Sequence, residues 1–294
     1  LYLSAMNAVQ LIECPRDAIQ GWPHAISTSD KIAYYKALLG VGFDTIDIGS
    51  FVSHKAVPQM ADTREILKRL HDEGMLEVSS RILTIVANER GAIDATQVPG
   101  VTDMGFPLSL SETFQQRNTG ASIKEAWQRL ERVKHHCERH DKQLVVYLSM
   151  GFGNPYGDEW NPNVLSDFIG QLDDQIQPQI IALSDTVGTA SPGMISAAFD
   201  MAIPSFKSIE FGAHLHAHPQ QVESKLAAAF ESGCRRFDGA IRGIGGCPMA
   251  QNELVGNIPT EHMMAYFENL DAWKLQNKRA WQHAMSIAVD LFQS

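Results

Sequence analysis

Short apolar runs recur along the chain between stretches of mixed polarity. Each run is rich in Val, Ile, Phe or Tyr and is bounded by Gly, Pro, Asp or Asn. This combination is typical of buried strands. The pattern predicts eight strands, at residues 9–13, 43–48, 81–87, 101–106, 143–149, 179–184, 209–216 and 234–241.

The segments between the runs carry the spacing of amphipathic helices. Apolar residues stand at 123, 127, 130 and 137 after Ser122, and at 32, 35 and 39 after the sequence STSD. Ser122 and Ser191 occupy N-cap positions, and Pro192 follows at a first helical position. We therefore expect these segments to be helices.

Strands that alternate with helices favour a parallel sheet covered by helices. Because no Pro/Ser linker or shift of composition divides the 294 residues, we expect a single domain over residues 1–294. The expected fold is α/β, a (β/α)8 TIM barrel with additional C-terminal helices at about residues 260–294 packed on it. The rival is a doubly wound open sheet, whose usual GxGxxG after the first strand is replaced here by ECPRDAIQG.

Charge and composition narrow the classes of partner. The chain has 24 Lys plus Arg against 34 Asp plus Glu, a formal net charge of -10, which argues against nucleic acid or an anionic membrane as partner. No apolar run reaches the roughly 18 residues of a membrane span. The four cysteines lack CxxC spacing, so a reducing, cytoplasmic setting without disulfides is expected.

The barrel prediction indicates where chemistry should lie, because active sites of this fold occupy the carboxyl ends of the strands and the loops that follow. Polar residues stand at most of these predicted ends. They are Arg16 and Asp17 after strand one, Asp47 and Ser50 at strand two, Asn88 after strand three, Asp185 after strand six, His214 and His216 in strand seven, and GIGGCP (243–248) after strand eight.

The sequence AHLHAH at 213–218 is the most unusual of these strand ends. In a strand, His214 and His216 point to the same face. The spacing alone fits either a hydrogen-bonded core pair or a pair that binds a divalent cation. The barrel context favours the cation, with a carboxylate oxygen from Asp17; His and oxygen ligands without Cys pairs suit Mg or Mn rather than a closed Zn site. His218, before Pro219, is expected to cap the next helix.

Arg16 and Cys247 each allow two interpretations. Arg16 beside Asp17 could form a structural ion pair, or it could stabilise an enolate oxygen next to a metal. Cys247 lies in a glycine-rich loop that is a tight turn or, alternatively, closes over a ligand and brings a thiol to a carbanion for proton transfer.

Seven motifs, in order, make the sequence resemble the 3-hydroxy-3-methylglutaryl-CoA lyases, a family of metal-dependent TIM barrels. The resemblance extends through nearly the whole chain. The motifs are PRDAIQ (15–20), SFVSHKAVPQM (50–60), SETFQQRN (111–118), SDTVGTASPG (184–193), HLH (214–216), GGCP (245–248) and GNIPTE (256–261).

The resemblance implies a set of site residues and a reaction. The reaction is retro-Claisen cleavage of 3-hydroxy-3-methylglutaryl-CoA to acetyl-CoA and acetoacetate, with a divalent cation, Mg or Mn, and no organic cofactor. The implied metal ligands are Asp17, His214, His216 and Asn257. Arg16 would stabilise the enolate, Asp17 or His214 would remove the hydroxyl proton, and Cys247 would help to protonate carbon. The residues that would line the substrate site are Gln20, Asp47, Ser50 and Asp185.

The resemblance also bears on assembly. Family members are often dimers, so a homodimer is compatible with it. Apolar residues of the C-terminal helices, Met263, Tyr266 and Phe267, could supply the interface.

The chain departs from the family pattern at four positions. The usual Glu of strand two is Asp47, the Pro of SFVSPK is His54, the Gly of RDG is Ala18, and HxHD ends in Ala217. Asp47 keeps the charge but is one methylene shorter, which puts the fit of the substrate in question.

Three other functions compete with the lyase. A Claisen-condensing synthase of the citramalate or isopropylmalate type shares the barrel, the Arg-Asp pair and HxH, but GGCP and SFVS favour the lyase. A Schiff-base aldolase is disfavoured because predicted strands five and six contain no Lys. A non-catalytic acyl-CoA-binding barrel would not need the acid–base set.

Overall fold

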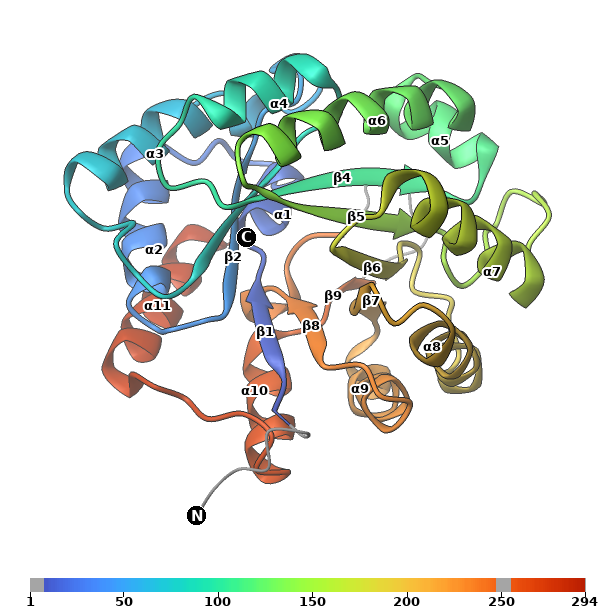
Figure 1. Ribbon diagram of the computed structural model, residues 1–294. Coiled ribbons are helices and arrows are strands. Elements are labelled where there is room, and N and C mark those ends of the chain that lie inside the picture. Colours follow the sequence, from blue (N-terminus) through green and yellow to red (C-terminus); the bar gives the residue numbers. More distant parts are fainter. Residues whose placement is uncertain (1–7, 247–254, 294) are drawn as a thin grey trace.

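Eight parallel strands close into a barrel in the computed structural model, which describes residues 8–246 and 255–293. Each strand pairs with its neighbour in chain order, and the pairing of β1 with β8 completes the ring. This confirms the predicted (β/α)8 barrel (Figure 1). The strands are β1 Gln10–Glu13, β2 Thr45–Ser50, β3 Arg81–Ile85, β4 Asp103–Ser109, β5 Gln143–Ser149, β6 Ile180–Asp185, β7 Glu210–Ala217 and β8 Arg236–Gly239.

Helices lie around the outside of the strands (Figure 1). They are α1 Pro15–Gln20, α2 Thr28–Leu39, α3 Thr63–Asp72, α4 Glu89–Thr96, α5 Glu112–Thr119, α6 Ile123–Arg139, α7 Pro162–Gln171, α8 Pro192–Ser205, α9 Val222–Glu231, α10 Thr260–Asn269 and α11 Lys278–Leu291. Short helical turns are η1 Pro58–Met60, η2 Leu172–Ile176, η3 Pro219–Gln221 and η4 Ile241–Gly243.

Two of the predicted helix caps are confirmed and one is wrong. Ser122 accepts a hydrogen bond from the Glu125 backbone N–H, and the Glu125 carboxylate accepts one from the Ser122 N–H, a complete capping box. Ser191 caps α8, which begins at Pro192. His218 precedes η3, but its side chain makes no capping hydrogen bond, because good N-caps carry a short side-chain oxygen that accepts from the second or third N–H, and imidazole has none.

A ninth strand, β9 Gly256–Asn257, was not predicted. It pairs antiparallel with β7 and sets Asn257 opposite His216. Two residues are too few to show a period along the sequence. This short pairing nevertheless carries a distant segment of the chain to the mouth of the barrel.

The C-terminal helices pack on the barrel with their apolar residues inward. Met263 and Phe267 of α10 are fully buried, and the Phe267 ring lies 4.6 Å from that of Phe237 in β8. The expectation that these two residues supply a dimer interface is therefore wrong, because they already cover β8. Phe292, just after α11, packs against Tyr34 of α2 at 6.1 Å between ring centroids.

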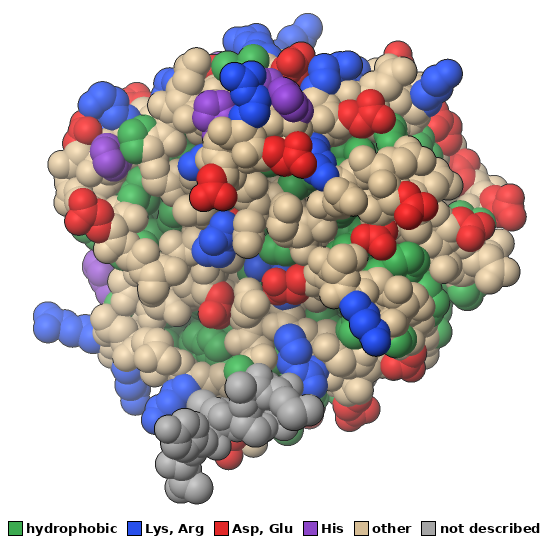
Figure 2. Space-filling model, viewed as in Figure 1, with side chains coloured by type: hydrophobic (Ala, Val, Ile, Leu, Met, Phe, Trp, Pro, Cys, Tyr) green, Lys and Arg blue, Asp and Glu red, His purple; other side chains and the backbone are tan. Residues whose placement is uncertain are grey.

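The surface carries mixed charge. On the face shown in Figure 2, acidic and basic side chains are interspersed rather than gathered into one basic patch. Among the described residues, no helix is long and apolar enough to cross a membrane.

Candidate active site

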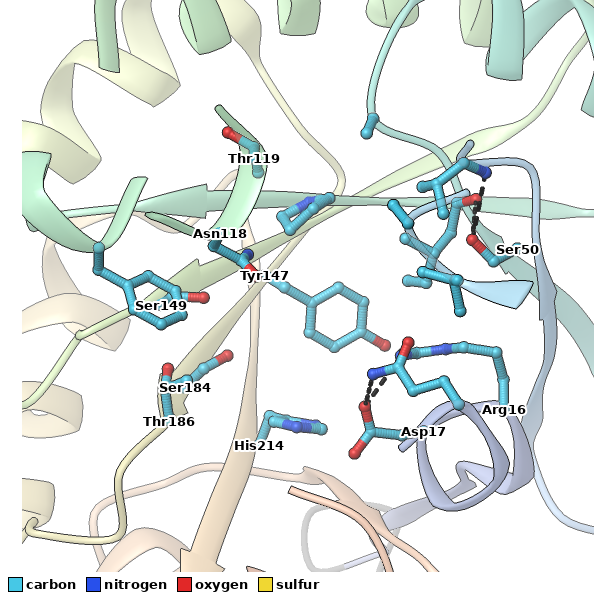
Figure 3. A pocket seen from close by; sticks show the side chains of 18 of the residues that line it. Arg16, Asp17, Ser50, Asn118, Thr119, Tyr147, Ser149, Ser184, Thr186 and His214 are labelled. Atoms are coloured by element: carbon cyan, nitrogen blue, oxygen red, sulfur yellow. Dashed lines mark hydrogen bonds and ion pairs between the residues drawn. The ribbon is translucent and has the colours of Figure 1, made fainter. Parts of the chain in front are cut away.

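A cavity of about 340 Å³ opens at the carboxyl ends of the strands. Its wall includes six of the residues predicted to form the site, contributed by α1, β2 and β7 (Figure 3). They are Arg16, Asp17, Gln20, Ser50, His214 and His216.

The first turn of α1 places Arg16 and Asp17 at this mouth. The helix begins at Pro15, two residues after β1 ends, and proline suits a first helical position because its φ is already helical and its missing N–H is not needed. The Asp17 N–H donates to the Cys14 carbonyl at 3.1 Å. Both side chains therefore project from a turn that follows directly on the end of β1.

Arg16 is held between two carboxylates. Its Nε and Nη2 donate to Asp47 Oδ2 at 2.9 and 2.5 Å, and its Nη1 donates to Asp17 Oδ1 at 2.9 Å. Burial opposes the charge of Arg16, but Asp47 and Asp17 raise its pKa above the ordinary value. A guanidinium has five N–H donors, so three are used here and two remain for a ligand.

The two histidines of β7 each have one ring nitrogen committed. His216 Nδ1 donates to the Thr186 carbonyl at 3.0 Å, and His214 Nδ1 lies 3.1 Å from Asp238 Oδ2, an acceptor. Because each partner accepts, Nε2 of both rings is left as the basic nitrogen. His216 Nε2 is buried and has no hydrogen-bond partner among the described residues, although buried polar atoms rarely lack one.

Burial opposes protonation of both rings, but their pKa values shift in opposite directions. It lowers the pKa of His216 to about 4, so this imidazole is neutral at pH 7. Burial also opposes protonation of His214, but the hydrogen bond and charge of Asp238 raise its pKa above the ordinary value. A histidine that donates Nδ1–H to a carboxylate or carbonyl is the usual arrangement of a metal-binding imidazole.

Asp17 completes a group of donor atoms with the two histidines. One ligand atom each from Asp17, His214 and His216 lie within 4.8 Å of one another. Burial works against the charge of Asp17, yet Arg16 and the neighbouring histidines hold its pKa down to about 2. An ionised carboxylate and two imidazole nitrogens, one of them the buried His216 Nε2, fit a divalent cation.

Asn257 lies beside this group. Its Nδ2 donates to Asp17 Oδ2 at 2.7 Å and to the Ile244 carbonyl at 3.0 Å. The amide oxygen is thereby left as an additional ligand atom. The structure thus brings together Asp17, His214, His216 and Asn257, which were predicted as ligands.

A second donor group, Cys14, His214 and Asp238, also lies within 4.8 Å. Burial raises the pKa of the Cys14 thiol well above its ordinary value, so the thiolate that binds metal does not form readily. His214 and Asp238 already bond to each other. This deeper group is therefore the poorer site.

The glycine-rich loop after β8 packs directly on the site. Gly245 has φ of +99°, and a Cβ there would lie 2.6 Å from Asn257 Nδ2 and 2.9 Å from the Asp17 carbonyl oxygen. Gly246 has φ of +126°, and its Cβ would lie 2.9 Å from the Val255 carbonyl oxygen. The loop lies against the ligand group, whereas Cys247, predicted to be its functional thiol, lies outside the described residues.

Two residues predicted to line the substrate site do not reach the cavity. Asp47 is fully buried behind Arg16. Asp185 lies between Ser184 and Thr186, which do line the cavity; strand alternation turns it away, and it pairs with Lys225 Nζ at 2.7 Å. Neither residue therefore lines the cavity as predicted. Asp47 instead orients Arg16, and Asp185 accepts from Lys225, which also donates to the His216 carbonyl.

The sequence reading missed Tyr147 and Asp238. Tyr147 lines the cavity, its ring packs edge-on to His214 at 5.5 Å, and its buried hydroxyl has no partner within the described residues. Both residues lie inside predicted strands, and for Tyr147 the available signal was a hydroxyl group within the apolar run VVYL. Alternation places Tyr147 on the same face as Ser149, at the carboxyl end of β5.

Known proteins that are similar to this chain in sequence and structure belong to the family that the motifs indicate. A family model described as HMGL-like matches residues 8–289. The chain is 28% identical over 264 residues to a 3-hydroxy-3-isohexenylglutaryl-CoA/hydroxy-methylglutaryl-CoA lyase of Pseudomonas aeruginosa, covering 90% of this chain and 86% of that protein. It is 28% identical over 272 residues to an (R)-citramalyl-CoA lyase of Chloroflexus aurantiacus, covering 90% and 85%. The solved structure of a Bacillus subtilis HMG-CoA lyase superimposes with a TM-score of 0.86 at 26% identity, covering 97% of this chain and 94% of that one.

Proposed function

Because the chain belongs to the HMGL-like family, we propose that it is a divalent-cation-dependent lyase that cleaves 3-hydroxy-3-methylglutaryl-CoA to acetyl-CoA and acetoacetate. One observation carries this: Asp17, His214 and His216 converge on the wall of a cavity next to Arg16, and no described residue bonds to His216 Nε2. The lyase of Pseudomonas aeruginosa, similar over most of its length, supports the choice of substrate.

The proposed ligands are Asp17, His214, His216 and Asn257, and the proposed cation is Mg or Mn. When bound, the cation lowers the pKa of the substrate hydroxyl and offsets negative charge on its oxygen atoms. Asp238 and the Thr186 carbonyl keep the imidazoles in the tautomer that presents Nε2.

Cleavage begins when the hydroxyl at C3 loses its proton. Two groups can accept it, the Asp17 carboxylate and the His214 imidazole. The C2–C3 bond then breaks: C3 becomes the ketone of acetoacetate, and the electron pair moves onto the thioester as an enolate. The two unused N–H groups of Arg16 would donate to the enolate oxygen, in a position held by Asp47.

The reaction ends when C2 takes up a proton and becomes the methyl group of acetyl-CoA. The proposed donor is the Cys247 thiol, directly or through water. Gly245 and Gly246 bring the chain against the ligand group immediately before this residue. The substrate loses one proton from its hydroxyl and gains one at C2. The base and the thiol therefore return to their starting protonation states once the base has released its proton and the thiol has taken one up.

Gln20 and Ser50 are proposed to contact the substrate. Gln20 Nε2 donates to Asp17 Oδ1 at 2.9 Å and lies on the cavity wall. Ser50 lies on the same wall, where its hydroxyl donates to the Ile85 carbonyl at 3.4 Å. Both side chains can therefore donate to a substrate oxygen in place of the protein oxygen.

A second candidate is cleavage of (R)-citramalyl-CoA, favoured by the equal identity to the Chloroflexus aurantiacus lyase. The same bond cleavage on that substrate yields pyruvate rather than acetoacetate. The smaller Asp47 in place of the family's Glu is compatible with either acyl group.

The test is a product assay with purified protein and Mn²⁺ or Mg²⁺, with chelator-treated protein as the control. We expect acetoacetate and acetyl-CoA in equal amounts from 3-hydroxy-3-methylglutaryl-CoA, and background rates with chelator. Pyruvate from citramalyl-CoA with no acetoacetate from the other substrate would select the second candidate. Absence of both ketoacids would reject the lyase proposal.

A further inference from the structure

One arginine that lines the cavity has no hydrogen-bond partner among the described residues. Arg16 is flanked by two carboxylates, but Arg129 of α6 makes no hydrogen bond or close ion pair with any described residue. It is half-buried, and its charged neighbour is the exposed Glu125, one turn earlier in the same helix. The cavity therefore holds a guanidinium whose five donors are not used by any described residue.

The neighbouring arginines are different. Arg132, one turn further along α6, lies 3.7 Å from Glu89, and the Arg117 guanidinium lies 4.8 Å from the centre of the Tyr156 ring. Neither is part of the cavity wall. Of these three arginines, the one that faces the cavity is the one whose guanidinium has neither a close carboxylate nor a ring contact among the described residues.

The cavity also has a polar end that is separate from the ligand group. Asn118 and Thr119 of α5 line the same cavity, and in Figure 3 they stand across the Tyr147 ring from Asp17 and His214. Apolar side chains, Ile85 and Pro107, form part of the wall as well. The cavity thus offers metal-ligating groups at one end and neutral and cationic donors elsewhere.

A guanidinium whose N–H groups have no acceptor among the described residues favours an anionic ligand. A guanidinium presents a planar fork that matches carboxylate and phosphate oxygens. The chain as a whole has a net charge of -10, so an anion is attracted only where positive charge is concentrated locally. Acyl-CoA thioesters of dicarboxylic acids carry both kinds of anion.

We infer that Arg129 is a specificity-determining residue that binds an anionic oxygen group of the acyl-CoA substrate. The group is the free carboxylate of the acyl part or a phosphate of coenzyme A. The inference rests on the proposed function for the choice of an acyl-CoA as ligand, but not on turnover.

The test measures binding rather than catalysis. Glutaryl-CoA lacks the 3-hydroxyl group and cannot be cleaved, and pentanoyl-CoA differs from it only by a methyl group in place of the terminal carboxylate. Dissociation constants are measured by calorimetry with Mn²⁺ for the wild type, Arg129→Gln and the control Arg132→Gln. The control removes one charge from the same helix without touching the cavity, and thermal melting verifies that both variants are folded.

We expect Arg129→Gln to weaken glutaryl-CoA binding about tenfold, the effect of one lost charge-assisted hydrogen bond, and Arg132→Gln to leave it unchanged. A loss for glutaryl-CoA alone identifies the carboxylate; an equal loss for pentanoyl-CoA identifies a phosphate. Wild-type affinity of Arg129→Gln for both thioesters would overturn the inference. If the wild type binds glutaryl-CoA but cleaves neither substrate named above, only the proposed function fails; if it binds no acyl-CoA, both fail.

Discussion

At the scale of single residues, glycine decides how closely the loop after β8 approaches the ligand group. Gly245 adopts a backbone conformation that L side chains rarely take, and the space where its Cβ would lie is occupied by Asn257 and the Asp17 backbone. Asn257 in turn donates to the Asp17 carboxylate. A side chain at position 245 would therefore displace two proposed ligands together.

Gly245→Ala is predicted to weaken Mn²⁺ binding at least tenfold, because the added Cβ meets Asn257 Nδ2 at 2.6 Å. Calorimetric titration with Mn²⁺ measures this effect. Gly74→Ala is the matched control: its φ is also positive, +70°, but its Cβ would meet nothing within 4 Å. The control should lose about 1 kcal/mol of stability and keep its metal affinity; an equal loss of affinity in both variants would contradict the proposed role of Gly245.

At the scale of elements, a buried carboxyl ties β1 to the C-terminal part of the chain. Glu13 ends β1 and is fully buried. Its Oε1 accepts from the Ile241 N–H of η4 at 3.1 Å, and its Oε2 accepts from the Thr260 hydroxyl at the start of α10 at 2.5 Å. Both elements flank the chain segment that carries Asn257, so β1 supports the site from behind as well as through Asp17.

Burial raises the pKa of Glu13 from its ordinary 4.5 to about 8. Between these values the folded chain retains a proton that the unfolded chain has released, so the stabilisation by the neutral carboxyl is complete below pH 4.5 and is lost as the pH rises to 8. Replacing Glu13 by Gln removes this titration.

The free energy of unfolding of the wild type, relative to Glu13→Gln, is predicted to fall between pH 5 and pH 8. The fall should exceed about 1.4 kcal/mol, the equivalent of one pKa unit. Urea unfolding at several pH values measures it in both proteins. Parallel pH profiles would show that Glu13 does not titrate in this range.

At the scale of the whole molecule, the proposed cation joins the beginning of the barrel to its end. Asp17 follows β1, the two histidines lie in β7, and Asn257 lies in β9 beyond the eighth strand. A ligand held by groups so far apart along the chain binds the folded state and not the unfolded one. Metal binding should therefore stabilise the entire barrel.

Mn²⁺ at 100 times its dissociation constant is predicted to raise the free energy of unfolding by about 2.7 kcal/mol. A chelator should reverse the change, and Asp17→Asn should abolish it because the neutral amide cannot supply the carboxylate charge. Denaturation curves with and without Mn²⁺ measure all three results. An undiminished shift in Asp17→Asn would place the cation elsewhere.

Much of the site could be predicted because strand alternation and barrel topology act together. The period of two puts His214 and His216 on one face, and parallel strands bring all carboxyl ends to one mouth. The same rule, applied to Asp185, shows why that prediction failed: its neighbours Ser184 and Thr186 face the cavity, and Asp185 faces Lys225. Tyr147 and Asp238 were missed because they stand inside the predicted strands 143–149 and 234–241 and not at their carboxyl ends.

The sequence by itself determined the class of fold, the helix caps Ser122 and Ser191 and the residues able to bind a cation, because these follow from local periodicity and from the chemistry of single side chains. Tertiary structure alone decided the antiparallel pairing that brings Asn257 to His216, the burial of Asp47 behind Arg16, the inward packing of Met263 and the placement of Arg129 on the cavity wall without a hydrogen bond to any described residue. The physical reason is that each of these depends on contacts between segments that are remote along the chain. Such contacts produce no periodic pattern in the sequence of either segment, so the sequence alone does not indicate them.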